Sequence, residues 1–227
     1  MRTAVVEDYV KTIYKLQTQT DKVSTSALAE RTGTTAAAVT KMLKHLDQLN
    51  LVAYTPYYGV RLTPVGEKIA LEVIRHHRLL ELYLAQAMGY SWDEVDAEAE
   101  KLEHVISEEF EARIDALLGH PRACPHGDPI PSPDGTLVEE HLRTLNECAP
   151  GETVTVARVK DTNAEVLRAL TARVIHLNTV VTVLDRDTID GLLTVQIDDT
   201  PQLLGPALAG SIFVQPHNRH EASTPGV

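Results

Sequence analysis

Residues 24–49 carry the sequence pattern that most constrains the fold. Ser24 or Thr25 can cap a short helix, because a hydroxyl oxygen there accepts a bond from a free N–H group at the helix start. Gly33 ends this helix, and a threonine just beyond it can cap a longer helix whose Val and Leu residues share one stripe. A short helix, a turn containing glycine and a longer helix are typical of a helix-turn-helix.

A β-hairpin is predicted directly after that helix. Residues 51–55 and 60–62 are short β-prone runs around a Pro-Tyr-Tyr-Gly turn, which indicates a wing. Thr63-Pro64 then predicts the start of a long helix, since threonine is a good cap and proline favours the first helical position. Gly89 ends that helix. The first third of the chain is therefore predicted to be a winged helix-turn-helix.

Such a fold places its second helix in the major groove of DNA. Threonine hydroxyls there can bond to bases or phosphates, alanine methyls can contact a thymine methyl, and basic side chains neutralise phosphates. The residues expected to contact DNA are Thr35, Ala36, Ala37, Thr40, Lys41, Lys44 and Arg61. The alternative is a helical hairpin used only for packing; the caps, the wing and the local positive charge together favour DNA binding.

The charge is unevenly distributed along the chain. The net charge is −11, which by itself argues against a nucleic-acid binder. Residues 1–78, however, carry 11 basic and 7 acidic side chains, a net of +4, and the remainder carries 10 and 25, a net of −15. A basic first third favours contact with a polyanion, and an acidic remainder favours cations or partners. Random surface variation is the alternative explanation.

The rest of the chain divides into a helical and a β-rich part. An amphipathic helix opens the chain, and a Ser-Glu capping box at 91–94 predicts one long helix over 91–118. Residues 119–135 hold five prolines and three glycines, which indicates a linker or an extended wrap. From about residue 151, short β-prone runs surround one short helix near 164–172, as in a small barrel.

Acidic and imidazole side chains cluster on the two long predicted helices. Glu100, Glu103 and His104 stand at i, i+3 and i+4, and His77 and Glu81 are four residues apart on the preceding helix. A short connection would bring the two faces together. Carboxylates and imidazoles without thiolate suit Mn²⁺ or Fe²⁺. A merely solvated, glutamate-rich face is the alternative, and the pairing of two such motifs makes the two readings about equally supported.

The two cysteines play different predicted roles. Cys124-Pro125-His126 lies in the proline-rich segment, where a thiol and an imidazole two residues apart can chelate one ion, whereas Cys148 is expected to be structural. Two cysteines form no disulfide framework, and the chain shows neither a signal-peptide pattern nor a run of about 20 apolar residues. A cytoplasmic protein without membrane contact is expected.

Taken together, these motifs resemble the diphtheria-toxin-repressor family of metal-dependent regulators, in particular its manganese-sensing branch. The resemblance covers nearly the whole chain. It is carried by the segments EDYVKTIY at 7–14, AVTKM at 38–42, HRLLE at 77–81, EKLEH at 100–104 and CPHGDPIP at 124–131.

The resemblance implies two metal sites in each subunit. The primary site would comprise Asp8, His77, Glu100, Glu103 and His104. The second would comprise Glu81, Cys124, His126 and Asp161. Iron-sensing members have Met and Cys where this chain has Asp8 and Glu100, which favours manganese. Short manganese regulators have Glu where this chain has Lys11, and this departure puts their paired-metal arrangement in doubt.

The resemblance also implies a mainly α fold with an SH3-like, FeoA-type β-barrel at its end. The expected divisions are a DNA-binding domain at 1–63, a dimerisation and metal-sensing domain at 64–135, a linker at 136–149, the barrel at 150–216 and a flexible tail at 217–227.

The implied function is a manganese-dependent repressor that controls metal-uptake genes. It would bind a palindromic operator in double-stranded DNA as a homodimer and would use no small-molecule substrate. An iron-dependent repressor is the near alternative, with Fe²⁺ in place of Mn²⁺, and Zn²⁺ or another divalent ion is open at the second site. A metallohydrolase is the distant alternative, because the same side chains could activate water; the expectation is that the chain is not an enzyme.

Overall fold

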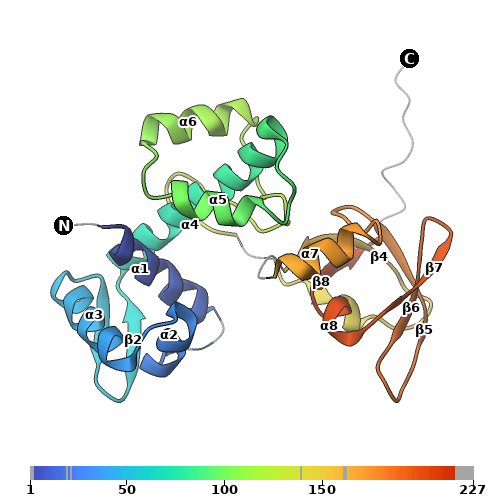
Figure 1. Cartoon of the computed structure of the whole chain (residues 1–227), viewed down its shortest axis with the longest axis horizontal. Helices are drawn as coiled ribbons and strands as arrows, with labels where there is room; N and C mark the ends of the chain where they lie inside the picture. Colours follow the sequence, from blue (N-terminus) through green and yellow to red (C-terminus); the bar gives the residue numbers. More distant parts are fainter. Residues whose placement is uncertain (1–2, 19, 21, 139, 161–162, 218–227) are drawn as a thin grey trace. The chain divides into compact units, whose positions relative to one another are not determined.

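The computed structural model describes residues 3–18, 20, 22–138, 140–160 and 163–217, which form two compact units (Figure 1). The first unit comprises Met1–Leu80, Ala99–Arg122 and Ile130–Val138, and the second comprises Glu81–Glu98, Ala123–Pro129 and Glu139–Val227. Each unit therefore combines segments that are distant in the sequence.

The first unit begins with the predicted winged helix-turn-helix. Its elements are α1 (Ala4–Gln17), α2 (Thr25–Thr32), α3 (Ala36–Gln48), β1 (Val52–Thr55) and β2 (Gly59–Leu62). Ser24 caps α2 by accepting from the Ala27 N–H, and Thr35 caps α3 by accepting from the Ala38 N–H. Gly33 ends α2 in the left-handed conformation, at φ 62°. The antiparallel β1–β2 pair forms the wing.

One apolar core holds these elements together. Val10 and Ile13 of α1, Leu28 of α2 and Leu43 and Leu46 of α3 are all fully buried in it. The same cluster includes residues of the wing and the start of the next helix. α3, the helix expected to enter the major groove, therefore shares its apolar core with α1, which carries the candidate metal ligand Asp8.

The long helix after the wing forms as predicted. α4 (Pro64–Met88) begins behind Thr63, whose hydroxyl accepts from the Gly66 N–H at 3.1 Å. The helix stops before Gly89, which has a φ of 74°. α4 contributes its residues through Leu80 to the first unit and its later residues to the second.

The single helix predicted over 91–118 is wrong. The chain forms α5 (Val95–Leu102) and α6 (Glu108–Leu117), separated by a turn. Ser107 caps α6 by accepting from the Phe110 N–H, and acidic residues fill the first turn of α6, where they favour a helix start. Ser91 does not cap a helix either: its N–H and hydroxyl both donate to the Glu94 carboxylate, within a turn.

The second unit contains a β domain, residues 143–216. It comprises β3 (Arg143–Thr144), the 3₁₀ helix η1 (Leu145–Glu147), β4 (Thr153–Val159), α7 (Ala164–Thr171), β5 (Val180–Arg186), β6 (Leu193–Ile197), β7 (Thr200–Leu204), α8 (Pro206–Ala209) and β8 (Ile212–Pro216). The strands form one antiparallel sheet in the order β3-β8-β4-β5-β6-β7. Alternate residues such as Val154 and Val156 point into a fully buried core. The predicted fold class is confirmed, although the sequence patterns did not reveal β7 and α8.

Candidate metal centre and nucleic-acid interface

The side chains predicted to contact DNA lie on the outer side of α3 and on the wing. Ala36, Ala37, Lys41 and Lys44 are exposed, as is Arg61 of β2. Thr35 and Thr40 are partly engaged within α3: Thr35 caps it, and the Thr40 hydroxyl donates to the Ala36 carbonyl at 2.8 Å. Alanine methyl groups are therefore accessible in the first turn of α3, and lysine ammonium groups are accessible further along the same helix.

The wing adds two exposed aromatic residues that the sequence prediction did not include. Tyr57 is fully exposed and Tyr58 is 70% exposed at the tip of the hairpin. Tyr57 has a φ of 67°, which directs the chain through the tight turn. The Lys22 ammonium lies 5.9 Å from the centre of the Tyr58 ring. The Pro-Tyr-Tyr-Gly turn between two predicted strands was the sequence feature that could have indicated these exposed aromatic residues.

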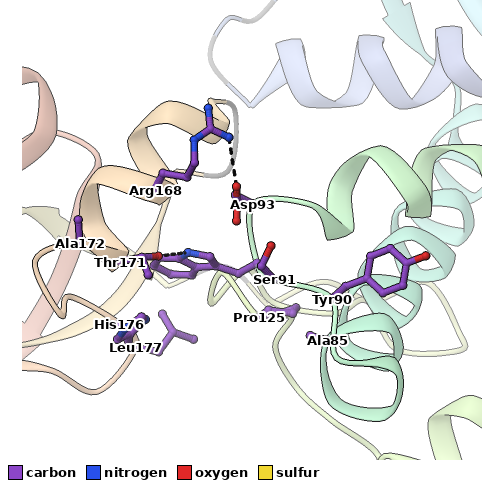
Figure 2. A pocket seen from close by; sticks show the side chains of 11 residues that line it. Ala85, Tyr90, Ser91, Asp93, Pro125, Arg168, Thr171, Ala172, His176 and Leu177 are labelled. Atoms are coloured by element: carbon purple, nitrogen blue, oxygen red, sulfur yellow. Dashed lines mark hydrogen bonds and ion pairs between the residues drawn. The ribbon is translucent and has the colours of Figure 1, made fainter.

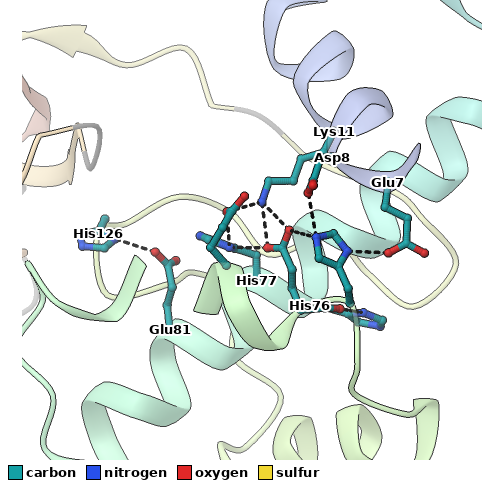
Figure 3. A network of polar contacts seen from close by, with 10 residues as sticks. Glu7, Asp8, Lys11, His76, His77, Glu81 and His126 are labelled. Carbon is teal, nitrogen blue, oxygen red and sulfur yellow. Dashed lines mark hydrogen bonds and ion pairs between the residues drawn. The ribbon is translucent and has the colours of Figure 1, made fainter. Parts of the chain in front are cut away.

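An imidazole in contact with Glu7 and Asp8 of α1 (Figure 3) connects that helix with the turn after α5, and this imidazole belongs to His104. Its Nε2 lies 2.8 Å from Asp8 Oδ1 and 3.3 Å from Glu103 Oε1, and its Nδ1 lies 2.6 Å from Glu7 Oε2. Asp8, Glu103 and His104 thus offer three ligand atoms that lie within 4.8 Å of one another. Glu7 is a neighbour that the sequence prediction did not include.

Lys11 occupies the centre of the other half of the predicted primary site, which comprises His77, Glu100 and Glu103. Its ammonium donates to Glu100 at 2.7 Å and to both oxygens of Glu103 at 2.6 and 2.8 Å (Figure 3). His77 Nδ1 lies 2.5 Å from Glu103 Oε2 and 3.6 Å from Glu100 Oε2. Glu103 therefore belongs to both groups, and its side chain is completely buried. All five predicted primary ligands come together, although Glu103 and His104 lie on a turn rather than a helical face.

The pKa values in this cluster are set by burial and by its dense charges. Burial raises the pKa of Asp8 above its usual range, although His104 opposes the shift. For Lys11, burial favours the neutral amine, but Glu103 and Glu100 outweigh it and raise the pKa of the ammonium. Burial also opposes ionisation of Glu103, yet His77 and Lys11 lower the pKa of its carboxyl group. Glu103 thus keeps its negative charge inside the buried cluster, where a cation can be bound.

A polar network behind Glu103 holds its backbone. His76 Nδ1 lies 3.1 Å from the Glu103 carbonyl oxygen, and His76 Nε2 lies 3.0 Å from Glu111 Oε2 on α6. Arg75 donates to Glu111 at 2.5 Å and to the Pro131 carbonyl at 2.8 Å. The turn that carries Glu103 is therefore supported from α4 and α6.

Replacing Glu111 should remove an acid-sensitive contribution to stability. The hydrogen bond from His76 is the main cause of the lowered pKa of Glu111, with Arg75 adding to it. A lowered folded-state pKa stabilises the protein above the unfolded pKa, about 4.3, and this contribution is lost as the pH falls through the folded-state value. Glu111→Gln should cost about 1–3 kcal/mol near neutral pH, and the difference from wild type should shrink below about pH 4.3.

Urea unfolding at several pH values measures this difference. Glu109→Gln is the matched control, because the exposed Glu109–Arg113 pair on the same helix should contribute at most about 1 kcal/mol. An equal loss at neutral and acidic pH would contradict the assigned role of Glu111.

The second donor group brings Glu81 of α4 together with Cys124 and His126, which lie on a loop packed against β4. Glu81, Cys124 and His126 are all buried, and their ligand atoms lie within 4.8 Å of one another. His126 Nδ1 lies 3.4 Å from Glu81 Oε1 and 3.9 Å from Cys124 Sγ. Val159 of β4 donates its N–H to the His126 carbonyl at 2.9 Å. Asp161, the fourth predicted ligand, lies outside the described residues.

Gly127 makes this close approach to β4 feasible. It has a φ of 89°, and a Cβ at this position would come within 2.2 Å of the Ala157 carbonyl oxygen. Only glycine tolerates both conditions without displacement of the loop. The sequence prediction had not recognised this requirement.

Both donor groups fit a divalent cation in their chemistry. The primary group offers three carboxylates and two imidazoles, a set of hard and borderline ligands, and the second adds one thiol to a carboxylate and an imidazole. The Lys11 ammonium, hydrogen-bonded within the primary group, shows that the group accepts positive charge.

No helix among the described residues is both long and apolar enough to cross a membrane.

Three family models match the chain in succession. The N-terminal DNA binding domain of iron dependent repressors matches residues 1–60, their metal binding and dimerisation domain matches residues 63–132, and the FeoA domain matches residues 143–216.

Individual relatives extend over most of the chain. The "Iron-dependent repressor IdeR" of Mycobacterium leprae (strain TN) is 32% identical over 157 residues, which cover 66% of this chain and 68% of that protein. A solved "Manganese-dependent transcriptional repressor complex with manganese" is 41% identical with a TM-score of 0.85, covering 93% of this chain and 100% of the other. A structure of "ScaR with bound Cd2+" is 34% identical with a TM-score of 0.79, covering 93% and 99%.

The fold and these similarities define a metal-dependent transcriptional repressor rather than an enzyme. The chain belongs to the diphtheria toxin repressor and IdeR family, as its sequence motifs predicted. The DNA-binding and dimerisation domains imply DNA and a second copy of the chain as its partners. The metallohydrolase alternative is thereby set aside.

Proposed function

We propose that this repressor is activated by Mn²⁺ held by Asp8, His77, Glu100, Glu103 and His104. The observation that carries the proposal is the position of His104, which contacts Asp8 on α1 as well as Glu103 beyond α5. α1 packs in the same core as the recognition helix α3. The donor group therefore connects the DNA-binding helices to the metal-binding and dimerisation segment.

The ligand chemistry supports manganese over iron. Asp8 and Glu100 supply hard oxygen atoms, which suit Mn²⁺ well, at positions where iron-sensing members have Met and Cys. The similarity to solved manganese-dependent repressors supports the same choice. Fe²⁺ is the competing ion, because relatives at lower identity are iron-dependent repressors.

The residues of the primary group can set the posture of the DNA-binding segment. Bound Mn²⁺ would supply positive charge that offsets repulsion among the clustered carboxylates. Asp8 would then be held toward Glu103 and His104, which fixes α1 and, through the shared core, α3. In a homodimer this arrangement would place two recognition helices about 34 Å apart, matching a palindromic operator, and we propose metal-uptake genes as targets. The coupling between metal and DNA is expected to be about 1–3 kcal/mol.

Fluorescence anisotropy with operator DNA selected by the Mn²⁺-loaded protein tests this proposal. Affinity should rise about 5–150-fold when Mn²⁺ is added, which corresponds to the coupling above. An anaerobic titration with Fe²⁺ tests the competing ion. Equal affinity with and without Mn²⁺ would refute activation by the metal, and a larger effect of Fe²⁺ would reassign the ion.

Phosphate contacts by α3 make a separate prediction. Lys44 is exposed on α3, so Lys44→Ala should weaken binding to all sequences and lower the slope of log affinity against log salt by about one. Anisotropy at several salt concentrations gives the slope. Lys68→Ala, which removes an exposed lysine from α4, is the control and should leave the slope unchanged. An unchanged slope in Lys44→Ala would place that side chain away from the phosphates.

We further propose that Glu81, Cys124 and His126, with Asp161, hold a second divalent ion. The burial and mutual approach of the first three residues support this assignment. Because a thiol and an imidazole also attract Zn²⁺, the native ion of this site could differ from that of the primary site. The loop that carries Cys124 and His126 is anchored on β4, so occupancy would stabilise the attachment of the loop to the β domain.

A further inference from the structure

Trp92, the only tryptophan in the chain, lies in the turn between α4 and α5. Its side chain is partly buried and packs against the apolar core of the β domain. One ring neighbour is His176, at 5.3 Å between ring centres, and with Tyr90 and Pro125 the indole lines a pocket (Figure 2). The Trp92 side chain thus extends from the turn between α4 and α5 and packs on the β domain, within the second unit.

A hydrogen bond fixes the indole on α7. Trp92 Nε1 donates to Thr171 Oγ1 at 2.7 Å, and the Thr171 hydroxyl donates in turn to the Leu167 carbonyl at 3.0 Å (Figure 2). Next to it, Arg168 donates to Asp93 at 3.1 Å. Two consecutive residues of the turn therefore bind two residues of α7, three positions apart on the same face.

The backbone of Trp92 acts on the second donor group. His126 is fully buried, and its Nε2 lies 2.7 Å from the Trp92 carbonyl oxygen, which can only accept a hydrogen bond. The proton of the neutral imidazole is thus held on Nε2, and Nδ1 presents its lone pair. Nδ1 is the atom that faces Glu81 and Cys124. The His126 ring also stacks on the indole, at 6.1 Å between centres and 24° between planes.

We propose that Trp92 is the positioning residue of the second metal site and couples its occupancy to α7 of the β domain. The carbonyl of Trp92 sets the tautomer and orientation of His126, as partners of metal-binding histidines commonly do. The indole, held by Thr171, ties that orientation to the β domain. This inference rests on the proposed second site and is independent of activation through the primary site.

Thr171→Val is the appropriate test, because it removes the acceptor for the indole while keeping the shape of the side chain and every ligand. Cd²⁺ is the probe, and all variants also carry Asp8→Asn to weaken the primary site without breaking the buried Lys11–Glu103 pair. Isothermal titration should give about tenfold weaker Cd²⁺ binding at the second site in Thr171→Val. Thr171→Ser, which retains the hydroxyl group, should restore it. Thr182→Val is the matched control, since it removes a threonine–threonine hydrogen bond within the sheet.

Fluorescence of Trp92 provides a second readout that a purely structural role would not change. Its emission should shift as Cd²⁺ fills the second site, and Cys124→Ser should abolish the shift. Thermal unfolding of each variant establishes that it is folded. Cd²⁺ affinity in Thr171→Val equal to that in Thr182→Val would overturn the role of Trp92.

A complete lack of Cd²⁺ binding at Cys124 would overturn both the second site and this inference, and would leave the primary-site function untouched. Conversely, equal operator affinity with and without Mn²⁺ in the anisotropy experiment would refute the proposed activation and would leave the Cd²⁺ result unaffected.

Discussion

Glu103→Gln is expected to abolish activation by Mn²⁺. Glu103 is shared by both halves of the primary group, where it contacts His77, His104 and Lys11 from a fully buried position. Loss of an outer-shell partner typically weakens metal binding about 10–100-fold, and loss of a central ligand should cost at least that much. The roughly 5–150-fold gain in operator affinity on Mn²⁺ addition should therefore disappear at metal concentrations that saturate wild type.

Anisotropy with and without Mn²⁺ measures this loss, and calorimetry measures Mn²⁺ affinity directly. Glu108→Gln is the matched control, because this exposed glutamate lies nearby in sequence at the start of α6. Glu103→Gln protein that is still activated like wild type would show that Mn²⁺ acts at another site.

Lys11→Met should destabilise the metal-free protein by about 3–5 kcal/mol. Lys11 and Glu103 form a buried ion pair, with side-chain exposures of 6% and 0%, and removal of one partner leaves the other charge buried and uncompensated. Methionine keeps an unbranched side chain of similar length but removes the ammonium group. Because a divalent ion would supply the missing positive charge, Mn²⁺ should restore much of the lost stability and raise the melting temperature of the variant more than that of wild type.

Thermal unfolding with and without Mn²⁺ gives both quantities. Lys15→Met removes the same residue type from a more exposed position on α1 and should change neither the stability nor the response to Mn²⁺ appreciably. A Lys11→Met protein as stable as wild type without metal would show that the pair contributes little. An unaltered Mn²⁺ response would separate Lys11 from the metal site.

Local signals in the sequence were sufficient for much of the fold. Ser24, Gly33 and Thr35 delimit α2 and α3 through caps that act within three or four residues, so the winged helix-turn-helix could be predicted. The break between α5 and α6 was missed, because Ser107 lies within an acidic run compatible with one continuous helix. Glu103 still follows the helical course, since its N–H donates to the Ala99 carbonyl, which explains why the predicted ligand spacing survived the error.

Several roles in the candidate sites depend on contacts between distant segments. Lys11 reads as an ordinary polar position on α1, and its burial follows only from carboxylates about 90 residues further along the chain. His76 and Trp92 likewise act through backbone carbonyl groups, Glu103 O as acceptor for the first and Trp92 O as acceptor from His126. Backbone acceptors have no signature in residue type, so sequence patterns could not identify these roles.

Anomalous X-ray diffraction at the manganese absorption edge, on crystals of the Mn²⁺-loaded protein, tests whether the ion joins α1 to the turn after α5. We expect a strong anomalous peak within coordination distance of Asp8, Glu103 and His104, the residues that connect α1 to the turn after α5. Manganese bound without contact to Asp8 would contradict activation through α1, because the ion would then have no direct contact with the DNA-binding helices.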